Sequence, residues 1–182
     1  MTNEEKLLER AQNGDVRAFE ELIGRHEKML YNIALRTMKN HADAADMAQE
    51  SILKLYRALP SFKGNCGFAV WAARVVVNTC LDELRRKARR EQPTEEETLT
   101  AALVDESAEQ AFARKELRER IALAIDSLDA DYRVAITLRD IEGMSYMEIA
   151  QVTGLAMGTV KSRINRARKL LAKKLALYLH DA

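Results

Sequence analysis

Apolar residues recur along most of this chain at intervals close to the roughly 3.6 residues of one α-helical turn. In the second predicted helix, the apolar positions that share one face are Phe19, Leu22, Ile23, Leu30 and Ile33. Charged and polar residues fill the remaining positions, so the helix has one face to bury. By the same criterion we expect helices over residues 3–11, 16–39, 42–59, 68–90, 112–128, 130–143, 146–154 and 159–174.

Capping residues indicate where several of the predicted helices begin and end. Asp15 is a good N-cap, because its carboxylate can accept a hydrogen bond from a free backbone N–H of the first turn. Ser145 and Glu148 have the spacing of a capping box, and Gly154 suits the turn that follows. Pro60 ends the third helix.

Composition supports an all-α fold. Apolar residues make up 47% of the 182 residues and aromatic residues only 5%, so the core must be aliphatic. The 7 glycines and 2 prolines are too few for a protein built from many hairpins. We expect two small helical domains, residues 1–91 and 112–182, joined by a flexible linker over residues 92–111 that is acidic and weakly periodic.

Charge is distributed unevenly, although the net charge is only +1. Residues 155–179 contain seven lysines and arginines and no acid, and residues 85–90 contain five cations. Residues 91–113 contain seven acids and no cation. Two basic zones separated by an acidic one indicate two surfaces for a polyanion.

The segment 144–174 has the pattern of a helix-turn-helix. On its second helix, Val160, Ile164, Ala167 and Leu171 fall on one face, and Gly158, Ser162, Asn165 and Lys169 on the opposite one. The apolar face can pack, while the polar face can read base edges in a major groove. A purely structural helical hairpin is the alternative, and DNA binding is favoured because caps, turn and both faces agree.

Two further patterns admit a functional or an ordinary explanation. Asp43, Asp46 and Glu50 share one helix face with Gln49 beside them, either as a solvated acidic face or as a docking patch for a basic partner. The helix over residues 68–90 combines aromatic residues with a basic end. Trp71 is more often a core residue than a base-stacking platform, and such an end often only complements the helix dipole.

No pattern of catalysis or of metal binding is present. The chain has neither a Walker loop nor a GxGxxG turn, and its three histidines are scattered. Cys66 and Cys80 lack metal-ligand spacing, so we expect reduced thiols. We therefore expect no enzyme, no cofactor, no metal and no small-molecule substrate. The charged N-terminus and the lack of a long apolar run predict a cytoplasmic protein.

Three stretches, taken together and in order, resemble the extracytoplasmic-function (ECF) group of the sigma-70 family. Residues 43–59, DAADMAQESILKLYRAL, are similar to the family's polymerase-binding helix. Residues 61–87 are similar to its segment that melts and reads the −10 element, and residues 138–171 to its −35-reading domain. The resemblance implies a transcription initiation factor whose partners are core RNA polymerase, promoter DNA and an anti-sigma factor, which could hold it at the membrane.

The resemblance also implies residue roles. For polymerase docking it implies Asp46, Gln49 and Glu50, with Asp43 on the same row. For the −10 element it implies Lys63, Asn65 and Asn78 as polar contacts, Trp71 packed beneath, and Arg85, Arg86 and Lys87 on phosphates. For the −35 element it implies base contacts by Lys161, Ser162, Asn165 and Arg166, and backbone contacts by Thr159, Arg163 and Lys169.

One departure and two rival functions stay open at this point. The chain has Asn65, Cys66 and Gly67 where the family's loop commonly carries a serine or threonine pair, which leaves the −10 specificity open and admits a redox-sensing thiol at Cys66. A free-standing repressor or activator could use the same helix-turn-helix. A protein-interaction module without a DNA role is the third alternative.

Overall fold

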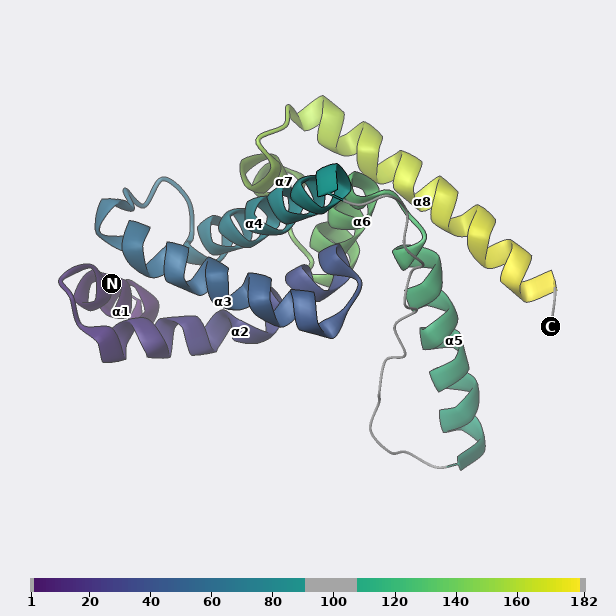
Figure 1. Cartoon of the computed structure of the whole chain (residues 1–182), viewed down its shortest axis with the longest axis horizontal. Helices are drawn as coiled ribbons and strands as arrows, with labels where there is room; N and C mark the ends of the chain where they lie inside the picture. Colours follow the sequence, from purple (N-terminus) through teal and green to yellow (C-terminus); the bar gives the residue numbers. More distant parts are fainter. Residues whose placement is uncertain (1, 91–107, 181–182) are drawn as a thin grey trace.

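The computed structural model describes residues 2–90 and 108–180, and all of its regular elements there are helical (Figure 1). Side chains are described for residues 2–90 and 116–176. The helices are α1 (Asn3–Gln12), α2 (Val16–Met38), α3 (His41–Ala58), α4 (Phe68–Arg90), α5 (Ala108–Asp126), α6 (Ala130–Ile136), α7 (Tyr146–Thr153) and α8 (Met157–His180). The expected all-α fold is confirmed.

Helices α1 to α4 form the N-terminal half, with α2 in contact with the other three. The predicted stripe of α2 is buried, and Leu22, Leu30 and Ile33 are almost wholly shielded from solvent. The side chain of Asp15 accepts a hydrogen bond from the N–H of Ala18 at 3.1 Å, as its N-cap position predicts. A short 3₁₀ turn, η1 (Leu59–Ser61), carries Pro60 and ends α3 as expected.

Helices α5 to α8 form the C-terminal half and contain the predicted helix-turn-helix. Ser145 and Glu148 make both hydrogen bonds of a capping box at the start of α7. Gly154 ends α7 in the left-handed conformation, with φ of 71°, which only glycine adopts without strain. The chain then turns directly into α8, so the two helices are fixed relative to each other.

The predicted continuous helix over residues 130–143 is wrong in one respect. After α6 the backbone widens into a π-helical turn, η2 (Thr137–Ile141). The N–H of Glu142 bonds to the carbonyl of Thr137 five residues back, at 2.9 Å. Such a turn shifts the helix face by one residue, and for this reason Ile141, although apolar, is 43% exposed.

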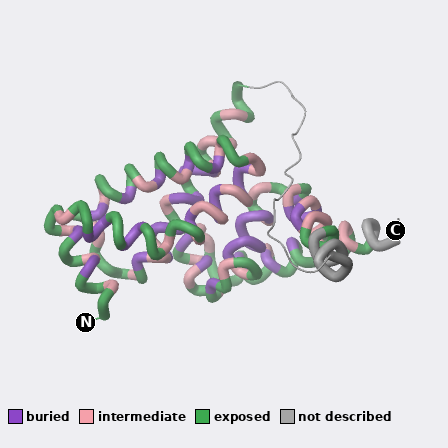
Figure 2. Tube along the Cα trace, turned by 90° about the horizontal axis from the view of Figure 1, so that it is seen from below, coloured by how far each residue is buried: buried purple, intermediate pink, exposed green. Residues whose placement is uncertain are grey.

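The two halves pack directly on each other. Helix α7 lies against α4, and α6 contacts α2. One continuous core includes Val76 and Val77 of α4 as well as Ile149 and Val152 of α7. Buried residues accordingly run through the middle of the molecule (Figure 2), and a smaller second cluster within the C-terminal half contains Ile125, Leu128, Ile136 and Ala167. Most of the expected linker, residues 92–111, lies outside the described residues, and α5 begins at Ala108 rather than at residue 112.

Candidate DNA and polymerase interfaces

The predicted recognition helix, α8, has one buried and one open face. Val160, Ile164 and Ala167 are at most 1% exposed, because α5, α6 and α7 cover them. On the remaining surface the structure leaves six of the seven predicted −35 residues exposed: Thr159, Lys161, Ser162, Asn165, Arg166 and Lys169. The seventh, Arg163, is half-buried. This arrangement presents donors and acceptors together on a rigid helix, as groove reading requires.

Two cations of α8 are held by acids of the same half of the chain. Arg163 forms an ion pair with Asp131 at 3.2 Å. Arg168 binds Asp140 through two nitrogens, at 2.5 and 3.1 Å, and this hydrogen bonding raises the pKa of Arg168. A phosphate approaching either arginine therefore has to compete with a carboxylate. The sequence carried no signal for these pairs, which join residues far apart in the chain.

Tyr146, the first residue of α7, was not among the predicted site residues. Its ring lies 4.8 Å from the guanidinium carbon of Arg139 and 6.0 Å from the Nζ of Lys161. Cations are attracted to the face of an aromatic ring at such distances. Tyr146 thus ties the predicted base contact Lys161 to the helix that precedes it in the motif.

The predicted polymerase-docking row lies on α3. Asp46, Gln49 and Glu50 are all exposed. The same face continues with Leu53 and Tyr56, which are 55% and 42% exposed although both are large and apolar. Exposed apolar side chains beside polar ones are typical of a protein contact. Their spacing of seven and ten residues from Asp46 was the signal that could have identified them.

Asp43 lies differently from the other members of the acidic row. Its carboxylate accepts hydrogen bonds from Lys87 of α4 at 2.5 Å and from the side chain of Asn40, and it is only 26% exposed. Burial raises the pKa of Asp43, but the bonds to Lys87 and Asn40 outweigh it and lower the pKa below its ordinary value. Asp43 and Lys87, predicted for two different interfaces, here join α3 to α4.

The predicted −10 segment combines an exposed loop with an aromatic base. Lys63 and Asn65 are exposed in the loop that precedes α4, and Asn78 is exposed on α4 itself. Trp71 is half-buried, and its ring stacks on Phe62 with centroids 4.6 Å apart. The loop is anchored from α1, because the side-chain amide of Gln12 donates to the carbonyl of Phe62 at 2.8 Å.

Apart from Lys87, the cations at the basic end of α4 are exposed to solvent. Arg85 and Arg86 are exposed, and among the residues whose side chains are described they make ion pairs only within their own helix, to Asp82 and Glu83. Exposed pairs of this kind contribute little stability, so both guanidinium groups can exchange their partner for a phosphate.

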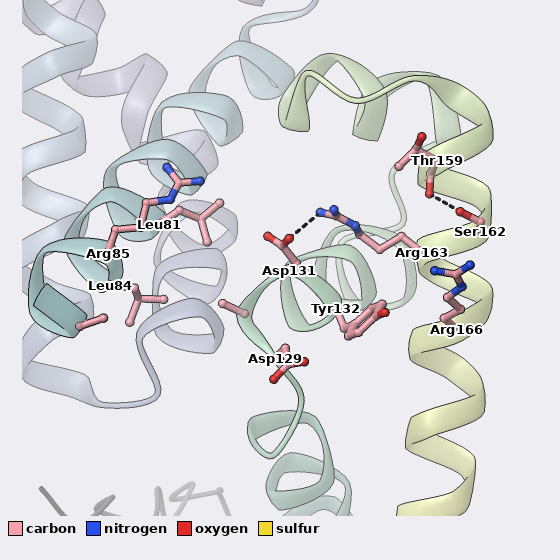
Figure 3. Close-up of a pocket in the computed structure, with 12 residues that line it drawn as sticks. Leu81, Leu84, Arg85, Asp129, Asp131, Tyr132, Thr159, Ser162, Arg163 and Arg166 are labelled. Carbon is pink, nitrogen blue, oxygen red and sulfur yellow. Dashed lines mark hydrogen bonds and ion pairs between the residues drawn. The ribbon is translucent and has the colours of Figure 1, made fainter. Parts of the chain in front are cut away.

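A cleft of about 640 Å³ lies between α4 on one side and α6 with α8 on the other. Figure 3 shows Leu81, Leu84 and Arg85 facing α6 and α8 across it. From α8 the lining side chains are Thr159, Ser162, Arg163 and Arg166, all of them predicted −35 residues. Part of the predicted DNA-reading surface therefore faces the N-terminal half of the same chain.

The two cysteines differ in environment. Cys80 is buried, and burial raises the pKa of its thiol to about 12. Cys66 is half-buried and lies within the predicted −10 loop, between Asn65 and Gly67. Within the described residues, no three histidines, cysteines or acids are placed to hold a metal ion. No helix described here is long and apolar enough to cross a membrane.

Family comparison agrees with these surfaces. The family model for "Sigma-70 region 2" matches residues 22–90, and the family model for "Sigma-70, region 4" matches residues 118–171. The two matches cover more than half of the chain. The chain belongs to the sigma-70 family. The first match contains the acidic row, the −10 loop and α4, and the second contains the helix-turn-helix.

Similar proteins of known function assign the chain to the ECF type within the sigma-70 family. The RNA polymerase sigma-H factor of Pseudomonas aeruginosa is 37% identical over 187 aligned residues, which cover 98% of this chain and 97% of the relative. The ECF RNA polymerase sigma-E factor of Escherichia coli is 36% identical and covers 92% of each chain. The protein is accordingly a sigma factor of the ECF type, which directs promoter-specific initiation of transcription by RNA polymerase.

Two solved structures have a similar fold. CnrH, solved with the cytosolic domain of CnrY, is 29% identical, with a TM-score of 0.68 over 97% of both chains. The sigma factor RpoE of Bartonella quintana, solved with the anti-sigma factor NepR, is 25% identical, with a TM-score of 0.74 over 87% of this chain. Both comparisons extend over the N-terminal and the C-terminal halves.

Proposed function

We propose that this sigma factor acts through three separate surfaces, one for core polymerase and two for promoter DNA. The observation that carries the proposal is the two-faced α8, whose apolar stripe is buried while six predicted −35 residues are exposed. A helix of this kind can enter the major groove and read base edges. By geometry, Asn165 is suited to adenine and Arg166 to guanine.

The second surface is the exposed row on α3, which would dock on a basic surface of the polymerase. Asp46 and Glu50 supply charge, and Leu53 and Tyr56 supply apolar area that becomes buried on binding. Asp43 contributes indirectly, since its bond to Lys87 fixes α3 against α4.

The third surface is the loop before α4 together with the exposed face of that helix. Lys63, Asn65 and Asn78 would contact unpaired −10 bases, and Arg85 and Arg86 would hold phosphates. The stack of Trp71 on Phe62 keeps the loop in place. Unstacking a base costs a few kcal/mol, which contacts in this region have to offset. The role is to hold opened strands, with no bond made or broken.

An anti-sigma factor is the proposed regulator, and the cytoplasm the proposed location. CnrH was solved with the cytosolic domain of CnrY, and the Bartonella quintana sigma factor with the anti-sigma factor NepR. Each matches this chain over both halves, so the surfaces available to such a partner are similar in kind.

Run-off transcription with purified core polymerase and genomic templates, followed by mapping of the start sites, tests the proposal. We expect a set of starts with shared −10 and −35 sequences. The double variant Lys161→Ala, Arg166→Ala should lose these starts, while an Arg17→Ala control on α2 should keep them. If the free protein binds one duplex sequence tightly without polymerase and supports no transcription, a free-standing regulator replaces the sigma factor.

A further inference from the structure

A cavity of about 560 Å³ lies between the start of α1 and the loop that precedes α4. Cavities of roughly 300–1,000 Å³ are typical of small-ligand sites. Figure 1 shows both segments at the same end of the N-terminal half. Along the loop, the proposed −10 contacts Lys63 and Asn65 alternate with the lining residues Gly64 and Cys66. The cavity therefore adjoins the surface that we propose for unpaired −10 bases.

The position of α1 against this loop is fixed by contacts of both segments. Leu7 and Ala11 are buried in the core that α1 shares with α2. The side-chain amide of Gln12 donates to two carbonyls of the connection between α3 and α4, that of Leu59 at 3.2 Å and that of Phe62 at 2.8 Å. A cavity wall held in this way is in place before a ligand arrives, which lowers the cost of binding.

The loop side of the cavity offers aromatic rings and backbone but few hydrogen-bonding side chains. Phe62 and Phe68 contribute rings, and Gly64 and Gly67 contribute no side chain. Cys66 adds a thiol, which is only a weak donor and acceptor. Stacking on an aromatic ring is available to every base. This wall can therefore hold the flat face of a base, but it does not distinguish one base from another.

The charged residues that line the cavity, Glu4 and Glu5, both come from α1. The Glu5 carboxylate accepts the N–H of Thr2 at 2.7 Å, and the Thr2 hydroxyl accepts the N–H of Glu5 at 3.2 Å, so the capping box of α1 uses both groups. The side chain of Glu4 is 40% exposed. Its Oε2 lies 3.5 Å from the Nε2 of His26 on α2, and this contact leaves its Oε1 for a ligand.

A carboxylate in the cavity decides which part of a nucleotide fits there. It accepts hydrogen bonds and repels phosphate, so it suits the edge of a base rather than the backbone. Cytosine, adenine and guanine carry an exocyclic amino group that donates, and a glutamate readily accepts from the N4 of cytosine. Thymine has no amino group, and its carbonyl oxygens are repelled by a carboxylate. Enzymes that flip bases also read the extruded base by its hydrogen-bonding edge and by stacking.

We propose that α1 forms one wall of the −10 base pocket, where Glu4 accepts a hydrogen bond from the exocyclic amino group of a flipped non-template base. This inference rests on the proposed −10 role of the loop. It adds a specificity-determining residue from outside the segment that the region 2 family model matches, because that match begins at residue 22. It also gives a source of −10 specificity to a chain whose loop has Asn65, Cys66 and Gly67 in place of the family's serine or threonine pair.

Deleting amino groups one at a time from a −10 oligonucleotide tests this proposal. The probe is the single-stranded non-template sequence of a mapped start site, and its binding to the holoenzyme is measured by fluorescence anisotropy at one salt concentration. Uracil replaces each cytosine, purine each adenine and hypoxanthine each guanine, so that every change eliminates one amino group. We expect a loss of about tenfold at one position, the size expected for one hydrogen bond to a charged group.

The variant Glu4→Ala shows which residue reads that position. In this variant the same deletion should cost less than about twofold, because two changes that remove one contact are not additive. Glu4→Gln keeps one acceptor oxygen and should give an intermediate loss. Glu9→Ala is the matched control, since it removes the same charge from an exposed position of α1 that does not line the cavity, and it should keep the wild-type loss. Ratios within each protein cancel the general gain in affinity that follows from removing a negative charge.

A wild-type holoenzyme that tolerates every amino deletion would overturn the proposal, and so would a Glu4→Ala variant that retains the full loss. Circular dichroism on the same samples confirms that each variant is folded. Failure of the proposed function gives a different result, because the wild-type holoenzyme would then bind the −10 oligonucleotide no better than a scrambled one. Sequence-specific binding that does not depend on Glu4 refutes the role of Glu4 alone.

Discussion

At the scale of single residues, neighbours that are adjacent in the helical pattern have different roles in the structure. Asp43 and Asp46 lie one turn apart on α3, yet Asp43 is bound to Lys87 and Asn40 while Asp46 is exposed. The sequence places both on one face, because periodicity alone does not show which of them meets α4. Only the folded chain separates the residue that fixes two helices from the residue that is free to bind.

This difference predicts the effect of reversing the charge at Asp46. Asp46→Arg should weaken binding to core polymerase at least about tenfold, because a cation then faces the basic partner surface. The midpoint of thermal unfolding should stay the same, since the side chain is exposed. Glu20→Arg, an exposed site on α2, is the control. If the Asp46→Arg variant assembles into holoenzyme at the wild-type level in a pull-down, α3 is not part of the interface with polymerase.

A second prediction concerns Arg166, which is exposed on the side of α8 that we propose reads bases. Arg166→Ala should cost about 1–3 kcal/mol of binding to the preferred −35 duplex and relax the base preference at one position. Lys169→Ala, assigned to the backbone, should weaken binding to all sequences about equally. Holoenzyme binding to a library of −35 duplexes measures both. An unchanged base preference in Arg166→Ala would assign Arg166 to phosphate instead.

At the scale of elements, α7 illustrates how a short helix is made stable enough to orient another one. Its 8 residues are too few for stability in isolation, and it depends on caps and packing. Ser145 and Glu148 close its start, Gly154 closes its end, and Ile149 and Val152 are buried. Ser145→Ala should therefore cost about 1 kcal/mol in the free energy of unfolding, measured with denaturant. Ser127→Ala, outside the helix-turn-helix, serves for comparison.

The same capping box gives α7 a defined pH dependence. The backbone N–H of Ser145 donates to the Glu148 carboxylate at 2.7 Å, and this bond, more than that of the Ser145 side chain, lowers the pKa of Glu148 below 4.5. The box stabilises fully above pH 4.5, the ordinary pKa, and its contribution is lost as the pH falls through the lowered value. Glu148→Gln should flatten this part of a stability–pH curve between neutral pH and about pH 3.

Sequence reasoning was most successful for elements whose ends are marked locally. The bounds of α4 were predicted to the residue, and the caps at Asp15, Ser145 and Gly154 were all confirmed. The sequence did not predict the π-helical turn η2. A π-helical turn contains one more residue than an α-helical turn, and the amino-acid composition of the segment does not reveal this extra residue. The ion pairs of Arg163 and Arg168 were missed because their acids lie on other elements.

At the scale of the whole molecule, the docking of the two halves was the feature least accessible from sequence. Nothing in the pattern of α4 or α7 shows that their apolar faces are covered by each other rather than by separate cores. Arg133 was likewise not predicted to be buried, since a charged residue on an amphipathic helix normally faces water. It is buried because backbone carbonyls from both halves accept its hydrogen bonds.

Arg133 therefore provides a test of how far the two halves fold as one unit. In Arg133→Met the carbonyls of Thr37 and Leu128 lose a donor, and a buried acceptor left without one costs about 1–3 kcal/mol. We expect a lower unfolding midpoint and faster amide hydrogen exchange in both α4 and α7, because each loses the other's protection. Arg118→Met, at an exposed position of α5, should change neither. Exchange that accelerates only within the C-terminal half would mean that Arg133 stabilises that half alone and that docking depends on the apolar contact between α4 and α7.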